Sequence, residues 1–549
     1  MRLVVTDAYT GAPLPGAEVV VGGRTETTDH EGRLMLDATD APAEVAIRSA
    51  GYAAAGGQLP PGQTGQLAVA LRPSIVEGRL TDAESGAPVS AAVSAPAPGV
   101  PGPSARTDAG GRFRLTDVPP NARLRIEAGD YGVVEEPINN RTTIDRALKV
   151  TVVTGTVTDA GGAPIAGATV SGPDGAAAAT TDAEGRYRLL GADGLAELKV
   201  RAPGYVDQTL PIPANRQAAV ALEPERIKAI YAPLGVLTDP NRLQRLIEIA
   251  DTTEANAIVV DVKQDTIYYD TQVPFFREVP DMVRPAFDPQ EILATLDEHG
   301  IYAIARMVVF KDPVVAEGRP DLAVRDENTG ELWRDFNGAA WVNAFNEELW
   351  QANADLAVEL AGLGFDEIQY DYIRFPSDGD LRTADFGPDY SEEARRAAIT
   401  GAVSRGAEAV RPTGARFAID LFPIIAIQGD DQGIGQTLQD LAPLVDSVNL
   451  MIYPSHYEEG NIPVDGHPND FPAETVAYTL ERAEELVPGT ALKMRPWLQD
   501  FDYPLEGFAD YGPAEVRAQI DAAEAAGASG WLLWNAVGEF EVEALAPES

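Results

Sequence analysis

The sequence predicts a multidomain protein: three small all-β sandwich modules followed by an α/β domain, a (β/α)8 (TIM) barrel. Three observations support this. The chain has 549 residues, which is too long for a single hydrophobic core. One motif recurs three times in the first 224 residues. After residue 224, short apolar segments alternate with longer helical segments, which is the pattern of a parallel sheet covered by helices.

Each copy of the repeat contains two short sequence motifs. The first reads VTDAYTGAPLPG from residue 5, LTDAESGAPVSA from residue 80 and VTDAGGAPIAGA from residue 157. The second reads TDHEGRLML, TDAGGRFRL and TDAEGRYRL, and its aspartates Asp29, Asp108 and Asp182 recur at intervals of 79 and 74 residues. This period indicates three modules, at residues 1–73, 74–149 and 150–224.

Each module contains short alternating runs separated by Gly, Pro and Asp, which is typical of a small antiparallel sandwich. The Asp-x-x-Gly sequence predicts a tight turn before a strand. These motifs resemble the carboxypeptidase regulatory-like domain family, a transthyretin-like β-sandwich. The resemblance implies spacer or adhesion units, so attachment to a cell wall or cell surface through the modules is expected.

Residues 225–549 form the predicted barrel. Strands are expected near residues 228–236, 257–265, 301–310, 365–375, 415–423, 446–454, 491–499 and 530–535. Helices are expected near residues 240–254, 288–299, 346–362, 391–411, 437–445, 474–487 and 513–527. Little sequence follows the eighth strand, so the last helix should be short or absent. A doubly wound open sheet is the alternative to a closed barrel.

Strand parity predicts a polar barrel interior, because alternate residues of a barrel strand face the axis and the helices. In IVVDVKQD, Ile258, Val260 and Val262 would face the helices, which turns Asp261, Lys263 and Asp265 inward. The same reading turns other polar side chains toward the axis: Glu367, Gln369, Asp371, Asp420, Lys493, Arg495, Trp497 and Gln499. Lys263, Glu367 and Lys493 lie mid-strand and could neutralise one another.

Two of these carboxylates are the candidate catalytic pair. Asp371 and Asp420 end neighbouring strands, at the face where barrels of this type build active sites. Glycoside hydrolysis uses two carboxyl groups, about 5–5.5 Å apart in retaining enzymes. Glu367 lies four residues before Asp371, roughly 13 Å along a strand at ~3.3 Å per residue, so it cannot be the partner and is expected to be structural.

Local sequence suggests the two roles. Arg374 lies close to Asp371 in sequence and would keep that carboxylate ionised, as a nucleophile must be. Asp420 lies among Ile419, Leu421 and Phe422, and an apolar setting raises a carboxyl pKa and suits a general acid. We therefore expect a retaining two-carboxylate mechanism with Asp371 as nucleophile and Asp420 as acid.

Other polar and aromatic residues near the strand ends are candidates for binding sugar hydroxyls or stacking on sugar rings. The predicted substrate-binding residues are Asp261, Lys263, Asp265, Arg306, Gln369, Arg374, Tyr453, His456, Arg495, Trp497, Gln499 and Trp534. No metal site or cofactor is expected, because the chain has no cysteine and only four histidines, without metal-ligand spacing.

Composition excludes some functions. A net charge of −43 argues against nucleic acid, whose binding needs Lys and Arg at the phosphates, and against anionic membrane surfaces. No apolar run reaches the roughly 20 residues of a membrane span, so membrane insertion is not expected. The start MRLVVTDAYTG shows no signal peptide. High acidity nevertheless fits an extracellular or cell-surface location.

Several motifs in chain order carry a second resemblance. VVDVKQD, ARMVVFKDP, GFDEIQYDYIRFPSDG, MIYPSHY, RPWLQDF and GWLLWNA resemble the glycoside hydrolase-like barrel family called DUF4015, over about residues 228–537. The resemblance implies similarity to α-amylase-like and α-galactosidase-like barrels, which place a nucleophilic Asp at the end of strand 4, here Asp371. Their acid follows strand 5 or 6, which favours Asp420, since strand 6 offers no carboxylate before Glu458. Pro423 departs from the Gly expected at the strand 5 exit.

The predicted function is therefore a glycoside hydrolase that cleaves a polysaccharide or oligosaccharide. The main alternative is a non-catalytic carbohydrate-binding or cell-wall-associated protein on the same scaffold. A polysaccharide deacetylase is disfavoured, because the sequence lacks a His-rich metal motif.

Overall fold

The computed structural model describes residues 1–37, 40–173, 175, 177–504 and 508–547. The chain divides into two compact units. The first comprises residues 1–157, 169–200 and 209–220; the second comprises residues 158–168, 201–208 and 221–549.

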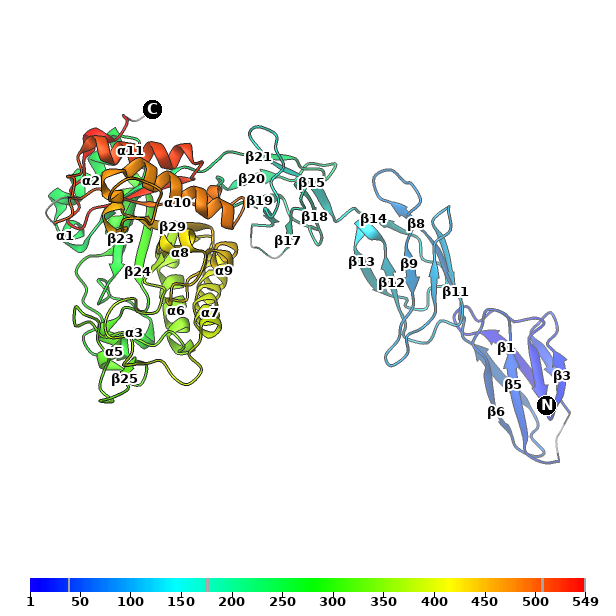
Figure 1. Ribbon diagram of the computed structural model, residues 1–549. Helices are drawn as coiled ribbons and strands as arrows, with labels where there is room; N and C mark the ends of the chain where they lie inside the picture. The colour runs from blue at the N-terminus through cyan, green and yellow to red at the C-terminus, as the bar shows by residue number, and fades with distance from the viewer. Residues whose placement is uncertain (38–39, 174, 176, 505–507, 548–549) are drawn as a thin grey trace. The chain divides into compact units, whose positions relative to one another are not determined.

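The repeats form sandwiches of one three-stranded and one four-stranded sheet (Figure 1). In residues 1–73 the sheets are β4-β1-β7 and β3-β2-β5-β6; in residues 74–149 they are β11-β8-β14 and β10-β9-β12-β13; in residues 150–224 they are β18-β15-β21 and β17-β16-β19-β20. Their strands are β1 Arg2–Asp7, β2 Glu18–Val21, β3 Arg24–Thr27, β4 Arg33–Met35, β5 Ala43–Arg48, β6 Ala55–Leu59, β7 Gln66–Leu71, β8 Val76–Asp82, β9 Ala92–Ser94, β10 Ser104–Arg106, β11 Arg112–Leu115, β12 Arg123–Glu127, β13 Val133–Pro137, β14 Arg146–Leu148, β15 Val153–Asp159, β16 Thr169–Ser171, β17 Ala178–Thr180, β18 Arg186–Leu189, β19 Glu197–Arg201, β20 Gln208–Pro211 and β21 Val220–Leu222.

The repeated aspartates make the predicted turns. The N–H of Gly32 donates to the carbonyl of Asp29 at 3.0 Å, and the N–H of Arg33 donates to the Asp29 carboxylate at 2.8 Å. The equivalent turns at Asp108 and Asp182 have the same two hydrogen bonds. The second motif thus encodes a side-chain-capped turn that leads into a strand of each sandwich.

Eight parallel strands close the barrel in the order in which they follow along the chain. They are β22 Ile227–Ala232, β23 Ala257–Lys263, β24 Tyr302–Val308, β26 Glu367–Asp371, β28 Arg416–Leu421, β29 Ser447–Ile452, β30 Trp497–Gln499 and β31 Gly530–Trp534. The predicted fold class is confirmed, and the open doubly wound sheet is wrong because β31 pairs with β22. Strand β30 is much shorter than expected, so Lys493 and Arg495 precede it rather than form part of it.

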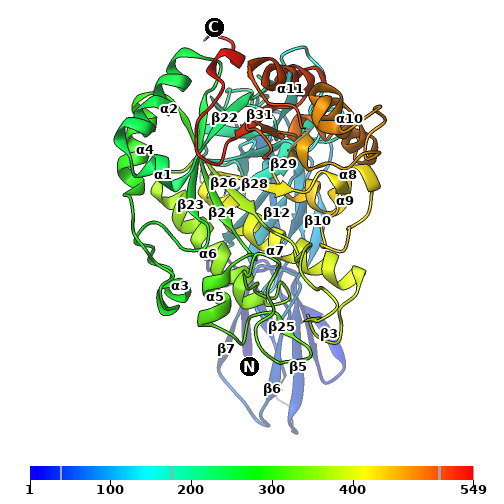
Figure 2. The ribbon, with the colours of Figure 1, turned by 60° about the vertical axis from the view of Figure 1, so that its left-hand side comes forward.

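Helices surround the strands, as Figure 2 shows for α2, α4, α6, α7, α10 and α11. The helices of this unit are α1 Leu234–Leu237, α2 Pro240–Thr252, α3 Pro274–Glu278, α4 Pro289–Glu298, α5 Pro313–Gly318, α6 Glu347–Leu363, α7 Glu392–Val410, α8 Ile424–Gln428, α9 Leu438–Leu441, α10 Pro472–Leu486 and α11 Pro513–Ala525; a short β25 Arg325–Asp326 pairs with β27 Ala384–Asp385. Only the 3-10 turn Val542–Ala544 follows β31 among the described residues. The prediction that the helix after the eighth strand is short or absent is therefore confirmed for the described residues.

The barrel strands separate two environments. Ile258, Val260 and Val262 pack outward in the large core against the helices. Ala229, Val259, Ile304 and Leu532 form a small apolar cluster inside, with Trp497 and Tyr231. The remaining interior is polar, as the parity of the strands predicts.

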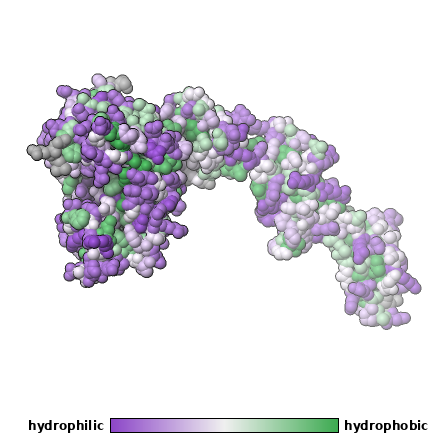
Figure 3. All heavy atoms as spheres, in the orientation of Figure 1, coloured by the Kyte–Doolittle hydropathy of each residue, from purple (hydrophilic) through white to green (hydrophobic). Residues whose placement is uncertain are grey.

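The barrel surface seen in Figure 3 is largely hydrophilic, in agreement with the acidic composition. Within the described ranges, no helix has the length and hydrophobicity needed to cross a membrane.

Candidate functional site

Asp371 ends strand β26, and the backbone turns sharply after it. Tyr372 has φ of 50°, a left-handed conformation that is unusual for a bulky residue. The turn directs the Tyr372 N–H to Asp371 Oδ1 at 2.6 Å. Such strained positions cluster at functional sites, and here the strained residue orients the candidate nucleophile.

Arg306 on β24 holds the other oxygen of Asp371. Its Nε and Nη2 donate to Asp371 Oδ2 at 3.0 and 2.5 Å. Its Nη1 donates to Asp261 Oδ1 at 2.7 Å, and Tyr231 donates its hydroxyl to Asp261 Oδ2. Burial lowers the pKa of Arg306, but the charges of Asp371 and Asp261 outweigh this effect and raise the pKa well above its ordinary value. Arg306, rather than the predicted Arg374, is therefore the guanidinium that binds the Asp371 carboxylate.

Asp420 lies on the strand next to Asp371. Tyr370 pairs with Ile419 across β26 and β28, so the next residues, Asp371 and Asp420, occupy matching positions on strands about 4.8 Å apart. Burial, followed by the charge of Asp371, raises the pKa of Asp420 well above its ordinary value. Its neutral acid form is therefore favoured.

Three donors converge on one oxygen of Asp420. Gln369 Nε2, Trp497 Nε1 and Asn449 Nδ2 donate to Asp420 Oδ1 at 2.7, 3.0 and 3.1 Å. Asp420 Oδ2 is buried without a hydrogen-bond partner among the described residues, which makes it the oxygen best suited to hold the proton. Gln369 is fully buried and positions Asp420, so it does not reach the cavity.

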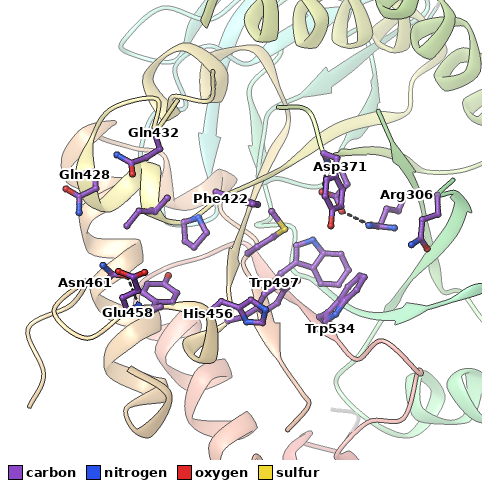
Figure 4. Close-up of a pocket in the computed structure, with 17 residues that line it drawn as sticks. Arg306, Asp371, Phe422, Gln428, Gln432, His456, Glu458, Asn461, Trp497 and Trp534 are labelled. Atoms are coloured by element: carbon purple, nitrogen blue, oxygen red, sulfur yellow. Dashed lines mark hydrogen bonds and ion pairs between the residues drawn. The ribbon is translucent and has the colours of Figure 1, made fainter. Parts of the chain in front are cut away.

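A cavity of about 710 Å³ opens above Asp371, within the range of about 300–1,000 Å³ typical of ligand sites. Figure 4 shows Asp371 and Arg306 at one end, Gln428, Glu458 and Asn461 at the other, and Phe422, His456 and Trp497 between them. Its walls come from the segments that follow β23, β26, β28 and β29, and from Arg306 on β24, Trp497 on β30 and Trp534 on β31. This is the carboxyl-terminal face of the barrel, as expected for an active site.

Six predicted residues come together in this lining: Arg306, Asp371, Tyr453, His456, Trp497 and Trp534. Trp534 stacks on Tyr231 with ring centroids 4.2 Å apart and lies edge-on to Trp497 at 5.5 Å. Partial burial of its ring lowers the pKa of His456, which favours the neutral imidazole. The lining therefore combines aromatic surface with two carboxylate side chains, Asp371 and Glu458.

Two predicted polar residues lie beneath the cavity floor. Asp420 and Asp261 are each 1 % exposed and are not part of the lining. Asp261 supports Arg306, and burial raises its pKa. In this arrangement neither carboxyl group is open to a ligand.

The other predicted binding residues lie outside the lining. Lys263 is fully buried and pairs with Asp312 at 2.8 Å, and the register between β23 and β24 shifts between Asp261 and Lys263. Asp265 is exposed on the loop after β23. Gln499 accepts from the Ser455 N–H and links two loops. None of the three takes the position predicted for it.

Arg374 and Arg495 are also displaced from the predicted site. Arg374 is buried between the rings of Trp341, Tyr372 and Phe422, at 5.0, 5.1 and 4.4 Å. Arg495 pairs with Glu367 at 2.5 Å, at the opposite end of the strands from Asp371.

Lys263, Glu367 and Lys493 do not neutralise one another, because each has different partners. Lys263 pairs with Asp312 and Glu367 with Arg495. Lys493 donates instead to the carbonyls of Ala442 and Val445. The structural role expected for Glu367 agrees with its pairing.

Sequence reasoning missed more than half of the lining: Gln264, Tyr372, Phe422, Pro423, Ile424, Gln428, Gln432, Met451, Tyr457, Glu458 and Asn461. Most follow β28 and β29 directly or lie on α8. Their position directly after the carboxyl ends of barrel strands, where active sites of this fold lie, is the sequence feature that could have identified them. In the part of the chain that the structure describes, no group of three or more acidic or histidine side chains is placed to hold a metal ion.

The fold and this site define a glycoside hydrolase-like TIM barrel. Residues 229–540, more than half of the chain, match the family model described as "Putative glycosyl hydrolase domain", DUF4015. The chain therefore belongs to the DUF4015 family. Residues 152–223 match the carboxypeptidase regulatory-like domain.

Solved structures give further similarities. A hypothetical protein from Ruminiclostridium thermocellum is 32% identical, with 35% of this chain and 96% of that chain covered and a TM-score of 0.32. The PgaB (BpsB) glycoside hydrolase domain from Bordetella bronchiseptica is 14% identical, with 59% and 99% covered and a TM-score of 0.46. An α-galactosidase from Thermus thermophilus is 16% identical, with 65% and 71% covered and a TM-score of 0.35. No curated protein matches the chain.

Proposed function

We propose that the barrel hydrolyses an O-glycosidic bond of a polysaccharide or oligosaccharide by a retaining two-carboxylate mechanism. One observation carries the proposal. Arg306 holds Asp371 at the end of a cavity. Asp420 supplies a second carboxyl group at the matching position of the next strand, and its environment favours the protonated form. A carboxylate held by a guanidinium and a carboxyl group that favours its protonated form, on neighbouring strands, suit the two roles that a retaining glycosidase requires.

In the first step, an oxygen of Asp371 bonds to the anomeric carbon while the bond from that carbon to the leaving oxygen breaks. The proton of Asp420 passes to the leaving oxygen. In the second step, the Asp420 carboxylate takes a proton from water, whose oxygen bonds to the anomeric carbon. The bond to Asp371 breaks, and both carboxyl groups return to their starting states.

Trp497 controls access to the proposed acid. Its indole N–H donates to Asp420 Oδ1, and its ring lines the cavity. Because Asp420 is 1 % exposed, its proton reaches a leaving oxygen only after the indole moves aside. The proposed mechanism therefore requires Trp497 to change position when substrate binds.

The test is a glycan panel incubated with wild type, Asp371→Asn and, as a matched control, Asp389→Asn. Asp389 is an exposed aspartate of the same unit and lies outside the cavity lining. We expect wild type and Asp389→Asn to release product with retained anomeric configuration and Asp371→Asn to lose at least about 10³-fold in kcat. Full activity of Asp371→Asn would disprove the assignment.

A barrel that binds glycans without cleaving them is the second candidate. Its specific support is that both oxygens of Asp371 accept hydrogen bonds and that Asp420 is sealed beneath the floor. The same panel separates the two candidates, because binding of a glycan by wild type without any product favours this second function.

A further inference from the structure

A second cavity of about 570 Å³ adjoins the one above Asp371. Both cavities include Tyr453, His456 and Trp534 in their linings, so these three residues form the boundary between them. The second cavity lies between the segments after β30 and β31, with Asp500, Phe501, Tyr503, Asn535 and Val537 among its lining residues.

Aromatic rings continue from the shared boundary into the second cavity. The His456 ring lies 5.4 Å from Tyr503 and 6.0 Å from Phe501, and Tyr453 lies 5.8 Å from Phe501. Phe501 and Tyr503 are partly exposed. Aromatic side chains combine an apolar face with, in Tyr, a polar end, which suits the apolar faces and hydroxyl rims of sugar rings.

Polar groups complete the lining. Asp500 is buried at the base of the second cavity, and its Oδ2 accepts a hydrogen bond from the Glu541 N–H at 3.1 Å. The exposed side chains of Asp502 and Glu539 lie at the cavity as well. A concave site that joins aromatic surface with a few acceptors is the common form of a ligand site.

Each cavity alone is large enough for a small ligand, since both volumes fall between about 300 and 1,000 Å³. A single sugar at Asp371 would leave the second cavity unused. A chain of sugars that crosses Tyr453, His456 and Trp534 can occupy both, because these three residues line both cavities and the cavities therefore adjoin.

We propose that the second cavity binds further sugar units of the same glycan chain whose scissile bond lies at Asp371. The inference rests on the proposed function and deepens it, because it names the substrate class: an oligosaccharide or polysaccharide long enough to cross the boundary residues. Short saccharides that fill only the first cavity are then poor substrates.

The experiment uses the full chain and a ladder of oligomers, from the disaccharide upward, of the glycan that the panel shows to be hydrolysed. Val537→Trp fills the second cavity, since Val537 is 58% exposed and lines that cavity alone. Tyr503→Ala removes one ring of its wall. Val542→Trp is the control, because Val542 is 41% exposed and lies outside both linings.

For wild type and Val542→Trp we expect kcat/KM to rise with oligomer length until the second cavity is filled. Val537→Trp and Tyr503→Ala should lose roughly tenfold or more of that rise and keep the wild-type rate on the shortest substrate. Thermal melts establish that the variants are folded. A length profile of Val537→Trp that coincides with wild type would overturn the inference and leave the glycosidase proposal standing.

An equal loss on every oligomer would also overturn the inference, because it would indicate damage to the first cavity. If wild type hydrolyses no glycan, the proposed function itself fails, and the inference fails with it. The two failures are thus distinguished by whether the wild-type protein has activity.

Discussion

Arg306 reaches Asp371 from the neighbouring strand and donates two N–H groups to a single carboxylate oxygen, at 3.0 and 2.5 Å. Arg306 pairs in register with Gln369, two residues before Asp371, so its long side chain extends toward the mouth of the barrel. Its remaining Nη1 binds Asp261. One guanidinium therefore balances two buried carboxylates and orients the candidate nucleophile.

Replacing Arg306 with Met should destabilise the barrel strongly. The variant leaves Asp261 and Asp371, both almost fully buried, without their cation, and breaking a buried ion pair on one side costs about 3–5 kcal/mol. Urea unfolding followed by Trp fluorescence measures this effect in the barrel alone, because all six tryptophans lie between residues 333 and 534.

Arg374→Met is the matched control for that measurement. Arg374 is also a buried arginine of the barrel, and no carboxylate among the described residues forms an ion pair with it. The variant loses cation–π contacts worth about 0.5–2 kcal/mol. It also no longer buries a charge, and this gain offsets the loss. If Arg374→Met lowered the free energy of unfolding as much as Arg306→Met does, the ion pairs of Arg306 with Asp261 and Asp371 would not be the cause of the destabilisation.

The acid role of Asp420 predicts a dependence on the leaving group. Asp420→Asn should lower kcat on the natural glycan by about 10²–10⁴-fold, the usual contribution of a general acid. The same variant should lower the rate of the first step far less on an activated aryl glycoside, because the leaving oxygen of such a substrate needs no proton. Steady-state kinetics on both substrates measure the difference, and an equal loss on both would exclude Asp420 as the proton donor.

Asp500 should make the stability of the barrel depend on pH. Burial raises the pKa of Asp500 to about 7, above the value of about 3.9 for an unfolded aspartate. Between these values the folded state binds more protons, so the free energy of unfolding falls as the pH rises, by at most about 1.4 kcal/mol per pH unit, and levels off above about pH 7.

Thermal melts across this pH range test the Asp500 prediction. Asp500→Asn should remove much of the decline between about pH 4 and pH 7. Asp510→Asn, which removes an exposed carboxylate of the same loop, should leave the decline in place. A wild-type melting temperature that rises steadily over this range would refute the expected sign.

The charges around the two cavities predict which glycans bind. Glu458 lines the first cavity, and Asp502, Glu539 and Glu541 line the second. Among the described residues of the two linings, Arg306 is the only arginine or lysine, and it is already paired with two carboxylates. Polyanionic glycans should therefore be repelled.

Chemical sulfation of the hydrolysed glycan tests the effect of charge with the sugar backbone kept constant. We expect the sulfated form to bind at least about tenfold more weakly, and the gap to narrow in high salt, because the Debye length falls from about 10 Å at 0.1 M to about 3 Å at 1 M. Isothermal titration calorimetry gives both affinities. Stronger binding of the sulfated form would contradict the prediction.

Many elements of the fold followed from local pattern. The eight strands and the helices from α2 to α11 that were expected lie where apolar periodicity placed them, with the largest differences at the short β30 and at α9. The parity of GFDEIQYDYI also predicted that Gln369 and Asp371 turn inward, since a strand fixes the direction of alternate side chains. Both residues lie in the polar interior that the parity predicted.

Partners across the barrel were not predictable in the same way. Arg374 is close to Asp371 in sequence, yet the left-handed turn at Tyr372 carries it into an aromatic enclosure. Arg306 lies 65 residues away along the chain and makes the ion pair. Sequence distance was therefore a poor guide to contact once the strand had ended.

The sequence by itself determined the three repeated sandwiches, the barrel and the rim position of Asp371, because these depend on periodicity and on order along the chain. Only the tertiary structure decided which guanidinium binds Asp371, that Asp420 lies beneath Trp497, and that two cavities meet at Tyr453. The physical reason is that closing the barrel brings together side chains from strands far apart in sequence. Their mutual burial then fixes partners and pKa values that no single segment encodes.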